Sequence, residues 1–253
     1  MSAQRILRVK APLAYRAVLD AVLFDWGDTL MQWAPEPDLL EAGHAAGFAA
    51  LGREPVAGIT ERFRDVYIAG FFEPGLVAEI EYPDEVRRLL AEFGVEVSDD
   101  ELERFLDAEH EAWRPACRLA STTHALLETL RDRGYKTGLV SNAFDPPRLL
   151  HRDLARLGVA ERLDVAVFSS EVGRRKPDRP IFEHALRVLE VDPGRALFVG
   201  DTLGTDIAGA AALGMRTCQA VWFRADEDGT APEPDFVAFT QMDVLTVASR
   251  LSE

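Results

Sequence analysis

From residue 116 onward, short apolar runs alternate with amphipathic segments. The apolar runs are rich in Val, Leu and Phe and lie at 135–142, 163–170, 196–202 and 216–223. The segments between them repeat apolar residues at three- and four-residue spacing, as helices do, and three of them end at a glycine, at positions 134, 158 and 214. Strands that alternate with helices form βαβ units with right-handed crossovers. The alternation therefore predicts an α/β fold, in which a parallel sheet carries helices on both faces.

The first third of the chain has a different pattern. An apolar run near 18–25 adds a strand, so we expect a Rossmann-like, doubly wound parallel sheet of at least five strands. The stretch that follows lacks such runs, and its periodicity predicts helices near 37–51, 60–72, 83–93 and 99–112. The last of these begins with a capping-box pattern from Ser98 to Glu101. We therefore predict an α/β core of residues 1–30 and 116–253, with an all-α domain of residues 31–115 inserted into it.

Composition limits the class of protein and its partners. Of the 253 residues, 47% are hydrophobic and 28% are charged, as in soluble globular proteins. The net charge of −15 argues against nucleic acid or an anionic membrane as a partner, because both attract clustered Lys and Arg. The two cysteines are far apart in the sequence, and no apolar run is long enough for a signal peptide or a membrane span. These features predict a cytoplasmic protein and give no information on its oligomeric state.

Polar residues follow the predicted strands where each one ends. Asp25 follows the first strand, Ser141 and Asn142 close the second, and Asp201 follows a later one, with Asp206 five residues beyond. In open α/β sheets, ligands bind outside the carboxyl ends of the strands. Each residue taken alone is also a common turn or N-cap residue. Their shared position at one edge of the sheet indicates a single site.

Four motifs at these positions resemble those of the haloacid dehalogenase superfamily of phosphohydrolases. They read "FDWGDTL", "LVSN", "SSEVGRRKPD" and "VGDTLGTDIAGA", and they are spread over nearly the whole chain. The resemblance is to the phosphoglycolate-phosphatase-like subgroup. It implies that the helical block 31–115 is the mobile cap, inserted after the first core strand, that closes over the substrate.

The resemblance also implies a role for each acidic residue. Asp25 would be the nucleophile, forming an aspartyl-phosphate, and would bind Mg²⁺ together with Asp201, Asp206 and the backbone carbonyl of Gly27. Mg²⁺ prefers oxygen ligands and offsets the negative charges that keep a carboxylate away from a phosphate. An alternative for Asp206 is stabilisation of the helix that begins there.

The second and third motifs would hold the phosphoryl group. Ser141 would contribute its hydroxyl and Asn142 would lie beside it, while Lys176 would place a positive charge near both the phosphoryl group and Asp25. The chain has only three lysines, at positions 10, 136 and 176, so a lysine at this place is informative.

The first motif departs from the family pattern in one respect. Most family phosphatases carry a second Asp two residues after the nucleophile, which protonates the leaving oxygen. Here that position is Gly27, and the next acid is Asp28. Three interpretations remain: Asp28 substitutes as the acid/base, the leaving group is acidic enough to need no proton, or turnover is weak and the role is regulatory. We favour Asp28 as the acid/base, with a turn residue as the alternative.

The sequence thus predicts a Mg²⁺-dependent phosphohydrolase of a small phosphorylated metabolite. One alternative is a catalytically weak protein that binds a phosphorylated ligand. Another is a dehalogenase or phosphonatase on the same fold. The phosphonatase relatives use a cap lysine, which residues 31–115 lack, and the dehalogenase relatives usually lack the acid pair Asp201 and Asp206.

Four further expectations concern residues outside the motifs. The glycines of "GHAAGFAALG" indicate a small-residue packing face, and the polar loop 224–234 indicates a solvated segment. Trp33 borders the substrate or packs at the hinge, and Trp113 packs near the returning hinge. None of the five histidines has metal-binding spacing.

Overall fold

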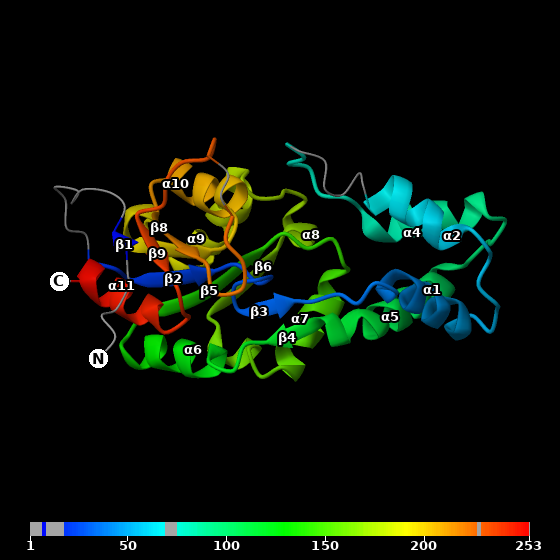
Figure 1. The fold of residues 1–253 in the computed structure, drawn as a ribbon, viewed down its shortest axis with the longest axis horizontal. Coiled ribbons are helices and arrows are strands. Elements are labelled where there is room, and N and C mark those ends of the chain that lie inside the picture. The colour runs from blue at the N-terminus through cyan, green and yellow to red at the C-terminus, as the bar shows by residue number, and fades with distance from the viewer. Residues whose placement is uncertain (1–6, 9–17, 69–74, 227–228, 253) are drawn as a thin grey trace.

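The computed structural model describes residues 7–8, 18–68, 75–226 and 229–252. Its main element is a seven-stranded sheet in the order β1-β9-β8-β7-β2-β5-β6 (Figure 1). In that order the strands are Leu7–Arg8, Phe236–Ala238, Arg216–Ala220, Ala196–Gly200, Ala21–Phe24, Lys136–Ser141 and Val165–Phe168. All neighbours are parallel except β1, which is antiparallel to β9. The five predicted strands are confirmed, and β1 and β9 extend one edge.

Helices cover both faces of this sheet, as a doubly wound fold requires. Val22 and Phe24 of the central strand point to one face and Ala21 and Leu23 to the other, because side chains alternate along a strand. The first face packs against α6 (Thr123–Asp132), α7 (Pro147–Arg156) and α11 (Asp243–Ser252). The second packs against α9 (Arg179–Leu189) and α10 (Ala208–Ala212).

Shorter elements complete the core connections. They are η2 (Arg114–Ala116), η3 (Ala160–Arg162), α8 (Ser169–Val172), η4 (Pro193–Arg195) and the π-helical turn η5 (Leu203–Ile207). The predicted glycine ends of three helices are confirmed, since Gly134, Gly158 and Gly214 have φ of 85°, 66° and 83°. Positive φ is a conformation that glycine adopts without steric cost.

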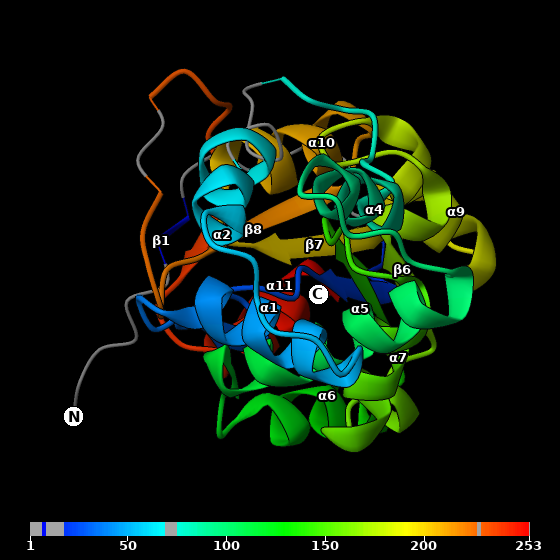
Figure 2. The same ribbon diagram turned by 90° about the vertical axis from the view of Figure 1, so that its right-hand side faces the viewer.

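A helical block leaves the core after the first motif and returns to it through a two-stranded ribbon. β3 (Met31–Trp33) pairs antiparallel with β4 (Cys117–Leu119). Between them lie α1 (Leu39–Ala50), α2 (Ile59–Arg62), the π-helical turn η1 (Phe63–Ile68), α4 (Tyr82–Glu92) and α5 (Asp99–Trp113). Four helices were expected here, and the end of the one at 60–72 lies outside the described residues. Figures 1 and 2 show the block beyond the carboxyl edge of the sheet.

The block has a hydrophobic core of its own. Helices α1 and α5 approach closely at two glycines, because a Cβ at Gly43 would lie 2.2 Å from Trp113 Nε1 and one at Gly47 would lie 2.6 Å from the Phe105 ring. The predicted small-residue packing face is therefore confirmed. The capping box of Ser98 and Glu101 at the start of α5 is also present. Among the described residues, no helix is long and apolar enough to cross a membrane.

Candidate active site

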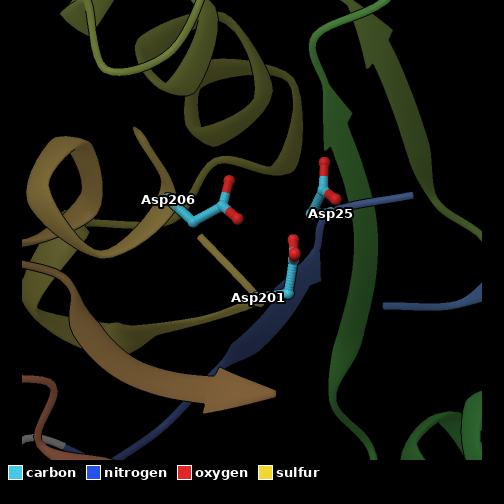
Figure 3. Close-up of side chains that lie close together, drawn as sticks. All are labelled: Asp25, Asp201 and Asp206. Carbon is cyan, nitrogen blue, oxygen red and sulfur yellow. The ribbon is translucent and has the colours of Figure 1, made fainter. Parts of the chain in front are cut away.

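Three buried carboxylates meet at the carboxyl edge of the sheet. Asp25 follows β2, Asp201 follows the adjacent parallel strand β7, and Asp206 lies in the π-helical turn η5 that comes next. One oxygen from each lies within 4.8 Å of the others, and Figure 3 shows the carboxylates facing a common centre. The three acids that the sequence singled out are thus brought together.

Gly200 allows this approach. A Cβ at that position would lie only 2.4 Å from Asp206 Oδ2, so any larger residue would displace the carboxylate. The same Oδ2 accepts a hydrogen bond from the backbone N–H of Thr202 at 3.0 Å, which fixes the side chain from its own turn. Single π-helical turns of this kind occur often at functional sites.

Lys176 is the buried cation of the cluster. It precedes α9, and its Nζ lies 2.5 Å from Asp25 Oδ1 and 2.6 Å from Asp206 Oδ1. Burial alone would lower the pKa of Lys176, but Asp206 and Asp25 together raise the pKa above its ordinary value. The lysine therefore stays charged between the two carboxylates.

The carboxylates carry more negative charge than Lys176 offsets. Burial and the neighbouring Asp25 raise the pKa of Asp201 to about 6, against the opposing effect of Arg224 and Lys176. Burial, Asp25 and Asp201 raise the pKa of Asp206 to about 7, against the opposing effect of Lys176. A set of carboxylate oxygens with surplus negative charge fits a hard divalent cation such as Mg²⁺.

Ser141 and Asn142 lie at the end of β5, as predicted. Ser141 is buried there. The Asn142 amide is fully engaged with the backbone of Lys176: its Oδ1 accepts from Lys176 N at 2.7 Å and its Nδ2 donates to Lys176 O at 3.1 Å. Asn142 therefore holds the lysine in position, a role that the sequence did not indicate.

Asp28 contacts Arg224, which also contacts Asp201. It has a positive φ of 51°, its Oδ1 accepts from the backbone N–H of Trp33 at 3.0 Å, and its Oδ2 lies 3.4 Å from Arg224 Nε. These contacts correspond to the alternative considered for Asp28, a turn residue that binds backbone. The acid/base role of Asp28 stays a prediction, and in this structure the carboxylate contacts Trp33 N and Arg224.

Arg224 was missed by the sequence reasoning. It lies in the segment expected to be solvated, yet its Nε lies 2.5 Å from Asp201 Oδ2 and its Nη2 donates to Thr202 Oγ1 at 2.9 Å. Asp226 of the same segment accepts from the backbone N–H of Leu203 at 2.8 Å. The start of this loop is exposed, as predicted, and it also contacts the site, which was not predicted. The available signal was the position of Arg224 just after β8, at the same edge of the sheet.

A cavity of about 470 Å³ opens between the core and the helical block. Its core side includes Gly27, Ser141 and Asn142, the last two of which the sequence predicts to bind a phosphoryl group. Its other side includes Trp33 of the ribbon and Trp113 at the end of α5. Both tryptophans, which the sequence placed near the hinge, thus border the space beside the site.

A buried histidine links the block to the core beside this cavity. His110 of α5 contacts Asp145 Oδ1 through Nδ1 at 2.8 Å and Asp153 Oδ2 through Nε2 at 2.9 Å. Burial would lower the pKa of His110, but the two carboxylates raise it to about 9. The imidazole is therefore protonated and donates to both acids.

Comparison with known proteins places the chain in a family. A family model described as haloacid dehalogenase-like hydrolase matches residues 19–214. The chain belongs to this family of hydrolases, as the motifs predicted.

Its relatives include different activities. The chain is 34% identical to an N-acetylmuramic acid 6-phosphate phosphatase of Pseudomonas aeruginosa, over 80% of this chain and 81% of that protein. Several other curated relatives are matched over only about half of their length. Among solved structures, a HAD phosphatase of Thermococcus onnurineus is 25% identical with a TM-score of 0.63, covering 90% of this chain and 97% of that one. A 2-haloacid dehalogenase of Pseudomonas syringae is also 25% identical, with a TM-score of 0.66 and coverage of 92% and 99%.

Proposed function

We propose that this hydrolase is a Mg²⁺-dependent phosphatase of small phosphorylated metabolites, in which Asp25 is the nucleophile. The observation that carries the proposal is the buried cluster of Asp25, Asp201 and Asp206 around Lys176. The phosphatases among its relatives support the substrate class.

The first step follows from the position of Asp25. Its carboxylate oxygen attacks phosphorus, the bond from phosphorus to the leaving oxygen breaks, and that oxygen keeps the electron pair. Lys176 stays charged and offsets the negative charge of nucleophile and phosphoryl group. The hydroxyl of Ser141 donates to a phosphoryl oxygen.

The second step returns Asp25 to its free state. Water attacks phosphorus of the aspartyl-phosphate, the bond from phosphorus to the Asp25 oxygen breaks, and Asp25 keeps the electron pair as a carboxylate. The proton of the water passes to solvent, and inorganic phosphate leaves. Asn142 keeps Lys176 in place through both steps by its two hydrogen bonds to the lysine backbone. A bound Mg²⁺ would be held by Asp25, Asp201 and Asp206, with the Gly27 carbonyl as a predicted fourth protein ligand, and would neutralise charge on the phosphoryl oxygens.

The inserted helical block, residues 31–115, serves as the cap in this proposal. It joins the core through the β3–β4 ribbon and covers the cavity beside the site. Substrate would enter between the block and the strand ends, and closure would exclude water from the nucleophile.

Halide displacement is less well supported than phosphoryl transfer. Three carboxylates with one buried lysine leave surplus negative charge, which repels a carboxylate substrate such as a 2-haloacid unless a metal offsets it. A dehalogenase that works without metal gains nothing from Asp201 and Asp206.

The direct test is hydrolysis of 4-nitrophenyl phosphate with and without Mg²⁺. We expect activity that EDTA removes and Mg²⁺ restores, and we expect Asp25→Asn to reduce kcat by ~10³ or more. The matched control is Asp20→Asn, at the opposite end of the β2 segment, where Asp20 pairs with Arg195.

Two further measurements, halide release and phosphate binding, test the alternative functions. Metal-independent halide release from a 2-haloacid would replace the phosphatase proposal with a dehalogenase. Tight phosphate binding with no turnover of any ester would favour the ligand-binding protein.

A further inference from the structure

We propose that the substrate is a phosphomonoester of an aryl type, with a flat, apolar, acidic hydroxyl compound as the leaving group and no second anionic group. This inference rests on the proposed phosphatase function and narrows its substrate class. Three features of the cavity carry it: the aromatic wall, the paired charges and the lack of a free proton donor.

The wall beside the phosphoryl site is aromatic. Trp26, Trp33, Trp113 and Phe144 all line the cavity, and three of the four tryptophans in the chain are therefore gathered here. A volume of about 470 Å³ accommodates a leaving group of one or two rings. Flat rings gain from packing against aromatic side chains, whereas a sugar would lose water from its hydroxyls without matching partners.

The cations in the described wall are already paired. Arg114 Nη1 lies 2.5 Å from Glu111 Oε2. His110 donates to Asp145 and Asp153, as described above. A second phosphate or a carboxylate on the substrate would therefore meet no unpaired positive charge among the described lining residues. Burying such a group without a partner is costly, which favours a leaving group without charge.

Around the first motif, no described side chain is free to protonate the leaving oxygen. Gly27 has no side chain, the Asp28 carboxylate is bound to Trp33 N and faces Arg224, and both ring nitrogens of His110 are engaged. When Asp25 attacks, the broken bond leaves its electron pair on the departing oxygen, which must leave as an anion and take its proton from solvent. A phenolate or enolate tolerates this charge, and an alkoxide does not.

The first experiment compares four phosphate esters with the Mg²⁺-loaded enzyme. Phenyl phosphate has a flat, acidic leaving group, benzyl phosphate a flat but non-acidic one, glycerol 2-phosphate a polar one, and phosphoglycolate an anionic one. We expect kcat/KM for phenyl phosphate to exceed that for benzyl phosphate by ~10² or more, since no group protonates an alkoxide. Glycerol 2-phosphate and phosphoglycolate should be poorer still, because they also lack the apolar contact.

The second experiment measures binding without turnover. Calorimetry with phenylphosphonate should show tighter binding than with methylphosphonate, and Trp33→Ala should weaken only the phenyl ligand, by about tenfold. Trp33 is 41% exposed, so its removal leaves the core intact. The control is Phe239→Ala, which removes another exposed aromatic residue that does not line the cavity.

The results separate this inference from the function on which it rests. Preference for glycerol 2-phosphate or phosphoglycolate, abolished by Asp25→Asn, would overturn the aryl class and leave the phosphatase standing. Equal affinity for the two phosphonates would also overturn it. Loss of the phosphatase function itself would appear as ester hydrolysis that Asp25→Asn leaves unchanged.

Discussion

At the scale of the residue, Gly27 stands where the first motif of most family phosphatases has an acid/base Asp. A Cβ at Gly27 would meet no other atom within 4 Å, and the residue lines the cavity beside the nucleophile. The φ of Gly27 is not positive, so an L-residue can adopt its backbone conformation. A larger side chain would therefore fit at this position. Lack of space does not explain why the position has no acid/base side chain.

We predict that Gly27→Asp adds the acid/base and broadens the substrate range. Hydrolysis of benzyl phosphate should rise by ~10², because the new carboxyl protonates the departing alkoxide, while phenyl phosphate should change much less. The control is Gly27→Asn, which has the same size and no titratable proton. Steady-state kcat/KM for both esters with both variants checks this, and an equal gain from Asn would contradict the role of proton transfer.

The sequence motifs predicted the acids and the lysine of the site. They did not predict the residues that hold them in place, Arg224 and Asn142. Asp25, Asp201 and Lys176 stand at recognisable places in motifs, so their meeting could be expected before the fold was known. Arg224 could not be predicted in the same way, because its contact with Asp201 depends on the course of the loop after β8. The engagement of Asn142 with Lys176 likewise depends on a loop that returns from far along the sequence.

At the scale of the element, the helical block is fastened to the core by buried charge. His110 of α5 bridges Asp145, in the loop after β5, and Asp153 on α7. A second contact joins Arg175, next to Lys176, to the buried Glu79 of the block at 3.1 Å. Polar contacts of this kind hold a docked position yet can be released, which suits a cap that must open for its substrate.

We predict that the His110 bridge makes stability depend on pH. The pKa of His110 is raised from 6.5 to about 9, so its stabilisation is complete below pH 6.5 and is lost as the pH rises through 9. The full shift corresponds to about 3 kcal/mol at most. His110→Gln should remove this part of the pH dependence, because glutamine carries no titratable proton.

Urea unfolding of the two proteins across this pH range measures the effect. Buried Glu109, whose pKa is raised to about 8, also destabilises the fold as pH rises, so the comparison uses the difference between wild type and variant. A difference that stays constant from pH 6.5 to 9 would show that the imidazolium does not carry the bridge.

Element prediction succeeded where periodicity was long enough to be seen. The four block helices and five core strands were found because each repeats its apolar pattern over several residues. The strands β3, β4 and β9 have three residues each, which is too short for a period of two to stand out. These strands form because each pairs with another strand, β3 with β4 and β9 with β8. The local sequence of a three-residue strand does not show which strand it will pair with.

At the scale of the whole molecule, the site holds positive charge although the chain as a whole is strongly acidic. The chain has a net charge of −15, yet Lys176 and Arg224 both lie against the acids at the strand ends. An acidic protein binds a phosphorylated ligand only when positive charge is concentrated locally. In the function proposed above, the acids at the sheet edge would hold the metal, and the helical block would contribute to the apolar wall around the leaving group.

The measurement that tests the central claim most directly is identification of the phosphorylated residue during turnover. The wild-type enzyme, mixed with phenyl phosphate and Mg²⁺ and quenched in acid within one turnover, should yield a phosphorylated peptide that contains Asp25. With no acid/base at Gly27 to activate water, this species should accumulate, and Asp25→Asn should abolish it. Phosphate release at an undiminished rate with Asp25 never modified, or a phosphoryl group found on another residue, would contradict the account.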